Sequence, residues 1–230
     1  MMEFEEFMIN FANIKFRIDR ACQLVGRDAN TVCLLPVTKT HGSWAVEYSI
    51  QAGLASVGEN RVQEVKEKQP IIEGDCGWEL IGHLQSNKVN EAVRLFDRIQ
   101  SVDSLKLIRK LNQSCAREGK KLPILLQCNA GEDPNKYGFA ESEMAEALEA
   151  VLDAPQLHCQ GLMTIAPLDS EPSSAEACFE KLRLIRDFLT ERYQYPLEEL
   201  SMGMTQDLEV AIAAGSTMIR VGTALFGHRA

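Results

Sequence analysis

The chain has 230 residues, of which 45% are hydrophobic and 25% charged, the composition of an ordinary folded protein. Its formal net charge of -9 excludes general binding of nucleic acid, because the chain would repel a phosphate backbone and no local basic run offsets the charge. The seven scattered cysteines have no C-x-x-C spacing, which favours reduced thiols in the cytoplasm over disulfides or a zinc site.

The hydrophobic pattern predicts one long helix over residues 3–26, followed by strands and helices in alternation. The strands are predicted at 32–39, 55–59, 78–83, 98–103, 123–130, 157–165, 198–203 and 218–223, and the helices at 43–53, 60–69, 87–96, 104–118, 141–153, 173–193 and 206–214. Alternation of this kind favours parallel strands, and eight such units close a (β/α)8 barrel. No linker divides the chain, so we expect a single α/β domain over residues 1–230. A doubly wound open sheet is the alternative architecture.

The active face of such a barrel lies at the carboxyl ends of its strands, and the unusual residues of this sequence gather there. They are Lys39, Glu59, Asn60, His83, Gln85, Asn129, Met163, Thr164, Ser201 to Thr205 and Arg220 to Thr223. Glu59 and Asn60 have an alternative interpretation as the cap of the next helix. His83 has no second histidine or cysteine at metal spacing, so we expect no metal site.

Lys39 stands at the end of the first predicted strand, in the stretch "LLPVTKTHG". A lysine at this place is either a solvated strand end or an amine with a shifted pKa that performs covalent chemistry.

The last two strands end in stretches typical of an anion site, "LSMGMTQDLEVAI" and "IRVGTALFG". Hydroxyl groups, glycines and the N–H groups of a helix start together bind anions, and many barrels hold a phosphate at these two loops. Either stretch alone could be ordinary helix capping, but the pair favours phosphate.

The stretches "LLPVTKTHG", "VGENRVQE", "WELIGHLQSNKV", "SVDSLKLIRKL", "NAGEDPNKYGF", "GLMTIAP" and "LSMGMTQDLEVAIAAGSTMIRVGTALFG" resemble the pyridoxal phosphate homeostasis protein (YggS/PROSC) family, whose barrel is similar to the N-terminal domain of alanine racemase. The resemblance implies a fold-type III barrel in which Lys39 carries pyridoxal 5'-phosphate (PLP) as a Schiff base, the internal aldimine. It implies that Arg220 faces the pyridine nitrogen. The other implied cofactor-binding residues are Asn60 and Met163 along the ring, Ser201, Gly203, Thr205, Gly222 and Thr223 around the phosphate, and Met202. One departure is Glu79, where the family commonly has histidine.

The resemblance further implies a function in vitamin B6 homeostasis: the protein buffers or delivers PLP and indirectly affects the balance of amino acids and keto acids. We expect no catalytic residue and no rapid catalysis, because Arg220 offers only hydrogen-bond donors and would leave the ring nitrogen unprotonated. Of the four tyrosines, only Tyr137 is placed near the barrel mouth. Two alternatives are a weak PLP-dependent amino-acid racemase and a Schiff-base aldolase acting on a sugar phosphate.

The expected ligands are PLP and amino acids, with neither nucleic acid nor membrane as a partner. No signal peptide or membrane-spanning stretch is recognisable, so we expect a cytoplasmic protein. We also expect a monomer that makes transient contact with PLP-requiring enzymes.

Overall fold

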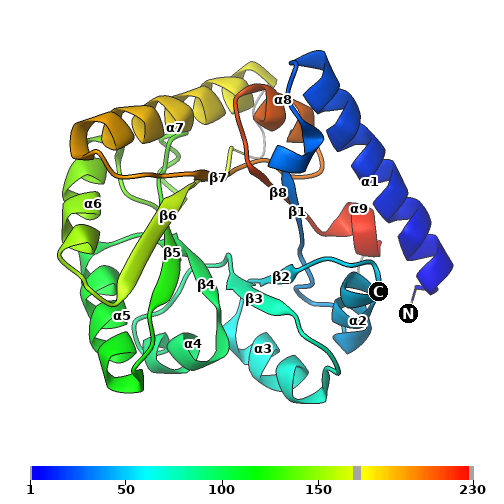
Figure 1. Ribbon diagram of the computed structural model, residues 1–230, viewed down its shortest axis with the longest axis horizontal. Helices are drawn as coiled ribbons and strands as arrows, with labels where there is room; N and C mark the ends of the chain where they lie inside the picture. Colours follow the sequence, from blue (N-terminus) through cyan, green and yellow to red (C-terminus); the bar gives the residue numbers. More distant parts are fainter. Residues whose placement is uncertain (1, 168–171, 228–230) are drawn as a thin grey trace.

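The computed structural model describes residues 2–167 and 172–227, and within them eight parallel strands form one ring (Figure 1). Along the sheet the order is β1-β8-β7-β6-β5-β4-β3-β2, and a parallel bridge between Val37 and Gly58 joins β1 to β2. The strands are β1 (Cys33–Pro36), β2 (Ser56–Glu59), β3 (Gly77–Leu80), β4 (Arg98–Val102), β5 (Leu122–Gln127), β6 (Leu157–Met163), β7 (Glu199–Ser201) and β8 (Met218–Val221). The predicted (β/α)8 barrel is confirmed, and the open-sheet alternative is wrong.

The helices form an outer ring around the strands (Figure 1). They are α1 (Phe4–Leu24), α2 (Ser43–Gln51), α3 (Val62–Lys68), α4 (Val89–Leu95), α5 (Leu105–Glu118), α6 (Met144–Leu152), α7 (Pro172–Tyr193), α8 (Leu208–Ala213) and α9 (Thr223–Phe226), with 3-10 turns at Ala29–Thr31, Gln69–Ile71 and Glu141–Glu143. The extra N-terminal helix α1 packs against α8 and α9. In the described part of the chain, no helix combines the length and the apolar character needed to cross a membrane.

Local sequence explains where the helices begin and end, as α5 illustrates. The hydroxyl of Ser104 accepts a hydrogen bond from the amide of Leu107 at the start of this helix. At its other end, Gly119 adopts a φ of 64°, a left-handed conformation that ends helices and that glycine tolerates best. Between these residues most of the apolar side chains are buried.

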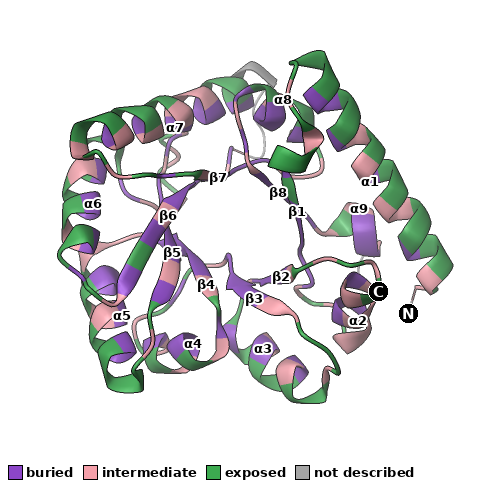
Figure 2. Ribbon diagram, viewed as in Figure 1, coloured by how far each residue is buried: buried purple, intermediate pink, exposed green. Residues whose placement is uncertain are grey.

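The buried apolar side chains form two separate clusters. The larger lies between the strands and the helices, so that most strand residues and the inner faces of the helices are buried (Figure 2). The smaller apolar set lies apart from it and contains only Leu35, Val37, Ile81 and Met218. Buried polar side chains on β3, β4, β7 and β8 accompany this small set, and they lead to the functional site.

The first strand is shorter than predicted, and this changes the place of Lys39. The strand ends at Pro36, and Val37 and Thr38 make the last hydrogen bonds to the neighbouring strands, to the carbonyl oxygens of Val221 at 2.8 Å and Gly58 at 3.0 Å. Lys39 therefore lies in the turn that follows and not at the strand end.

Candidate functional site

The predicted site residues lie at the ends of five neighbouring strands, β6, β7, β8, β1 and β2. Met163 is the register partner of Ser201, and Arg220 is the partner of Leu35 on β1. A Cβ atom built on Gly222 would lie 3.3 Å from the carbonyl oxygen of Val37, so the loop after β8 runs close beside the turn of Lys39. The barrel thus brings together segments separated by more than half of the chain.

Arg220 is 4% exposed and is fixed by two hydrogen bonds. Its Nη1 donates to the hydroxyl of Ser201 at 2.7 Å, and its Nη2 donates to the carbonyl oxygen of Thr164 at 2.8 Å. Burial lowers the pKa of Arg220 to about 10, and the charge of Asp207 opposes this shift. The guanidinium therefore keeps its positive charge at neutral pH.

A chain of hydrogen bonds continues from Ser201 across the barrel interior to Glu79 on β3. The hydroxyl of Ser201 donates to Oε1 of Gln100 at 2.6 Å, and Nε2 of Gln100 donates to Oε2 of Glu79 at 2.6 Å. Glu79 also accepts from Ser56 at 2.7 Å and from Nε and Nη2 of Arg98 at 2.7 and 2.9 Å. Burial alone would lower the pKa of Arg98, but the hydrogen bonds and charge of Glu79 outweigh it and raise this pKa.

The carboxylate at Glu79 sets the direction of the whole chain. An ionised carboxylate only accepts hydrogen bonds, so the amide nitrogen of Gln100 must face it and the amide oxygen must face Ser201. The Ser201 hydroxyl then donates its only proton in the hydrogen bond to Gln100, and the Ser201 oxygen accepts a hydrogen bond from Arg220. Glu79 is thus a buried acceptor in this interior chain.

The hydroxyl groups predicted to surround the phosphate differ in their hydrogen-bond partners. Among the described residues, those of Thr205 and Thr223 have no hydrogen-bond partner, whereas that of Ser201 has two. Two unpartnered hydroxyl donors on adjacent loops suit the chemistry of a phosphate.

The backbone between Ser201 and Thr205 is shaped by Gly203. This residue has a φ of 95°, and a Cβ atom built on it would lie 2.4 Å from the Cβ of Ala211. Only glycine fits there without a shift of the chain. Its carbonyl oxygen accepts a hydrogen bond of 3.0 Å from the amide of Arg220, while Met202 is fully buried beneath the loop.

The interpretation of Glu59 and Asn60 as a helix cap is wrong. Helix α3 begins at Val62, with Arg61 as its extended N-cap residue and without a side-chain cap. Glu59 is fully buried and turns toward Lys68, whose Nζ lies 2.7 Å from its Oε1. Asn60 is half-buried, and its backbone lies against Gly82, where a Cβ atom would come within 2.3 Å of the Asn60 carbonyl oxygen.

His83 and Tyr137 meet at the rim of the barrel, from the loops after β3 and β5. Their rings stack with centroids 3.8 Å apart, and Nδ1 of His83 lies 2.7 Å from Oδ2 of Asp103. In the same region, Gln85 accepts a backbone hydrogen bond from Lys88 at 2.9 Å, and the side chain of Asn129 holds the backbone of Asp133. These residues shape the loops of the rim.

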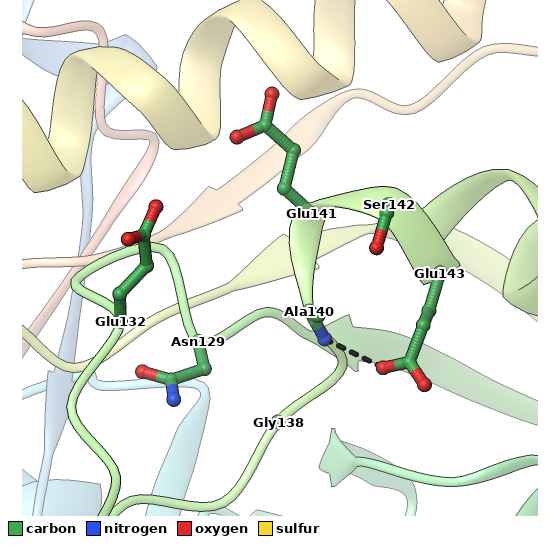
Figure 3. A pocket seen from close by; sticks show the side chains of 7 residues that line it. All are labelled: Asn129, Glu132, Gly138, Ala140, Glu141, Ser142 and Glu143. Carbon is green, nitrogen blue, oxygen red and sulfur yellow. Dashed lines mark hydrogen bonds between the residues drawn. The ribbon is translucent and has the colours of Figure 1, made fainter.

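A cavity of about 650 Å³ lies beside the loop after β5, at the start of α6 (Figure 3). Its lining consists of Asn129, Glu132, Gly138, Ala140, Glu141, Ser142 and Glu143. Three carboxylates in this set would repel a phosphate, and none of the predicted cofactor-binding residues belongs to it. We therefore distinguish this acidic cavity from the candidate site at β6, β7, β8, β1 and β2.

The barrel and the placement of its polar strand ends define a protein of the alanine racemase class. Residues 9–230 match the profile of the family described as "Alanine racemase, N-terminal domain". The alanine racemase of Clostridium difficile shares the fold with a TM-score of 0.79, although only 14% of the aligned residues are identical and the match covers 97% of this chain and 57% of the racemase.

Closer relatives narrow the class to one family. The pyridoxal phosphate homeostasis protein of Pseudomonas aeruginosa is 39% identical over 96% of this chain and 94% of its own length, and that of Aquifex aeolicus is 36% identical over 93% and 94%. The PipY protein of Synechococcus elongatus, solved with PLP bound, is 36% identical with a TM-score of 0.81, over 92% of this chain and all of PipY. The chain belongs to the pyridoxal phosphate homeostasis protein family.

Proposed function

We propose that this chain binds PLP at the candidate site, holds it as a Schiff base on Lys39, and buffers or delivers it within vitamin B6 homeostasis. One observation carries the proposal: the turn of Lys39, the buried Arg220 and two threonine hydroxyls without a partner among the described residues lie at adjacent strand ends. The relatives of this chain, in addition, are named for PLP homeostasis. When bound, PLP supplies an aldehyde that condenses with a primary amine with loss of one water molecule.

The residues of this chain then have distinct roles in the proposed site. Thr205 and Thr223 donate hydrogen bonds to the phosphate, with Met202, Gly203 and Gly222 shaping the backbone around it. Asn60 and Met163 line the ring. Arg220, held by Ser201 and Thr164, presents a donor to the ring nitrogen.

We test the Lys39 assignment by covalent trapping. Purified protein incubated with PLP should absorb in the region of a Schiff base, and borohydride reduction followed by peptide mass mapping should locate the cofactor on Lys39. Lys39→Ala should lose both signals and stay folded, because the side chain lies in a half-exposed turn outside the apolar core. A cofactor trapped mainly on another lysine of the wild-type protein would refute the assignment. A protein without a Schiff-base signal in the presence of PLP would favour the aldolase alternative.

We further propose that the protein is not a rapid enzyme, and the chemistry of Arg220 is the reason. Its guanidinium can only donate hydrogen bonds, so a ring nitrogen against it stays unprotonated and withdraws electrons weakly from the α-carbon of a bound amino acid. Exchange of the α-proton of added amino acids in deuterated water, followed by NMR, should run well below the roughly 1–10³ per second of typical enzymes. Exchange or racemisation within that range would support the racemase alternative instead.

The cytoplasm as location, a monomeric state and transient contact with PLP-requiring enzymes complete the proposal. Size-exclusion chromatography with light scattering tests the monomer directly.

A further inference from the structure

The two peptide groups that flank Lys39 are both held by side chains of α3. The carbonyl oxygen of Thr38, in the peptide before Lys39, accepts a hydrogen bond of 2.9 Å from Nζ of Lys68. The amide nitrogen of Thr40, in the peptide after Lys39, donates a hydrogen bond of 2.6 Å to Oε2 of Glu64. Because peptide groups are planar, fixing both of them fixes the direction in which the Lys39 side chain leaves the backbone.

Glu59 at the end of β2 connects these contacts into one cluster. Its Oε1 accepts from the hydroxyl of Thr38 at 2.6 Å and from Nζ of Lys68 at 2.7 Å. Lys68 also lies 3.4 Å from Oε2 of Glu64, one helical turn earlier. We name the cluster of Glu59, Glu64 and Lys68 the Lys39 clamp. It holds the peptide before the lysine through the ammonium group of Lys68 and the peptide after it through the carboxylate of Glu64, and the ammonium group links the two carboxylates.

The turn that the clamp holds is not a conformation the chain prefers. Thr40 has a φ of 65°, in the left-handed region that β-branched residues rarely occupy. A residue persists there only where its surroundings fix it, and such residues are common at functional sites. The hydrogen bond from the Thr40 amide to Glu64 provides this restraint.

The clamp is also an unusual use of buried charge. The side chain of Lys68 is 9% exposed and that of Glu59 is 0% exposed. Among the described residues, Oε2 of Glu59 has no hydrogen-bond partner, and burial raises the pKa of this carboxyl against the opposing charge of Lys68. Apolar residues often replace a buried ion pair without loss of stability, so the pair is better explained by the geometry that it imposes.

We propose that Glu59, Glu64 and Lys68 are positioning residues that aim Lys39 at its aldehyde partner and thereby set the rate of covalent capture of PLP. The inference rests on the proposed function, because that function assigns Lys39 as the cofactor lysine. It predicts that loss of the clamp slows formation of the carbon–nitrogen bond but leaves the preceding non-covalent binding nearly unchanged.

Two clamp variants and two matched controls test the inference in the full chain. Glu64→Met removes the acceptor for the Thr40 amide, whereas Glu64→Gln keeps an acceptor oxygen. The double variant Glu59→Gln/Lys68→Met removes the donor to Thr38 without leaving one buried charge alone. Lys66→Met changes an exposed lysine of the same helix that pairs with Glu91 outside the clamp.

The measurements separate binding from capture. Stopped-flow absorbance at several PLP concentrations gives the rate of the covalent step, and titration with pyridoxine 5'-phosphate, which lacks the aldehyde, gives non-covalent affinity. Both clamp variants should slow capture by at least about tenfold, since small misplacements of a reacting group have large effects on rate. Their affinity for pyridoxine 5'-phosphate should change less than about twofold. Amide hydrogen exchange of Thr40 in cofactor-free protein should become faster in Glu64→Met and not in Glu64→Gln.

The outcomes distinguish the inference from the function beneath it. If the wild-type protein traps no PLP on Lys39, the proposed function and the inference both fail. If it does, and both clamp variants capture PLP at the wild-type rate, the inference alone fails. The inference would also be overturned if Glu64→Gln and Lys66→Met slowed capture of PLP as much as the clamp variants do. Those two controls preserve the contacts that hold the turn.

Discussion

Three hydroxyl groups of the candidate site, on Ser201, Thr205 and Thr223, differ in whether their proton is already donated in a hydrogen bond. Ser201 donates its proton to Gln100 and accepts from Arg220, so a phosphate would have to compete with an existing bond for that proton. The hydroxyls of the two threonines make no hydrogen bond to any described residue. We therefore expect the threonines to bind the phosphate and Ser201 to act through the orientation of Arg220.

This difference predicts how the three residues affect binding of PLP and of pyridoxal, which lacks the phosphate. Thr205→Val and Thr223→Val should each weaken PLP binding by about 1.5–3 kcal/mol, the contribution of one hydrogen bond to a charged group, and should leave pyridoxal binding unchanged. Ser201→Ala should weaken both vitamers by the same factor. Titration of each variant with each vitamer measures this. A loss confined to PLP in Ser201→Ala would place that hydroxyl on the phosphate instead.

Single residues also show which parts of the candidate site can be predicted from sequence. Lys39 and Arg220 belong to motifs that single them out in the sequence, and their roles toward PLP stay predictions. Gln100 and Lys68 do not stand out in this way, because each acts on a residue distant in the sequence. A weaker signal exists for Gln100, since Glu79, Arg98 and Gln100 are polar residues within short apolar strands, where an interior-facing polar group needs a partner.

At the scale of elements, α1 contacts the loop of Thr205, between β7 and α8, from outside the barrel. Nη2 of Arg17 donates to the carbonyl oxygen of Thr205 at 2.8 Å, and the same guanidinium pairs with Glu209 of α8 through bonds of 2.7 and 2.8 Å. The helix that precedes the first strand thus contacts the loop after the seventh.

Arg17→Met should therefore loosen the loop of Thr205. We expect faster amide hydrogen exchange over residues 205–209 and weaker PLP binding, because the loop must then be ordered when the cofactor binds. Lys15→Met is the control, since among the described residues Lys15 pairs within α1, with Asp19 at 3.6 Å. Unchanged exchange in Arg17→Met would show that the loop does not depend on this helix.

The ion pair of Arg17 and Glu209 also predicts an acid dependence. The hydrogen bond from Arg17 lowers the pKa of Glu209 in the folded protein below that of an unfolded glutamate, about 4.3. The pair therefore stabilises the fold above that value, and its contribution is lost as the pH falls through the lowered folded pKa. Denaturant unfolding over this acid range should show the difference between wild type and Arg17→Met shrinking.

For the molecule as a whole, the alternation of strand and helix is enough to predict the barrel. Each strand is a short apolar run that is recognisable without its partners, and parallel order follows from the helices between them. The turn at Lys39 is not predictable in this way. Val37 and Thr38 have the character of strand residues and still bond to the neighbouring strands, but Glu64 and Lys68 of α3 then hold the chain in a turn.

The hydrogen-bond chain from Glu79 to Arg220 connects opposite sides of the barrel, from β3 through β4 and β7 to β8. Glu79→Gln would exchange one acceptor oxygen for a donor nitrogen at the start of this chain. Arg98 would lose the nearer of its two carboxylate partners and keep Glu199, 3.7 Å from its Nη1, so the loss should stay below the roughly 3–5 kcal/mol that breaking a buried ion pair costs. The amide of Gln100 would also be free to turn its nitrogen toward Ser201, which would release the hydroxyl proton that now points to Gln100.

We therefore expect Glu79→Gln to lower the free energy of unfolding and also to change PLP affinity and the absorption maximum of the bound cofactor, since the acceptor that orients Arg220 is altered. Ser56→Ala is the matched control: it removes one donor to Oε1 of Glu79 and leaves the bond between Oε2 and Gln100 in place. This variant should lose only about 1 kcal/mol of stability and keep the wild-type affinity and spectrum. Urea unfolding, PLP titration and absorbance spectra of both variants decide the question. If Glu79→Gln is destabilised but binds PLP with unchanged affinity and spectrum, Glu79 supports the barrel without any influence on Arg220.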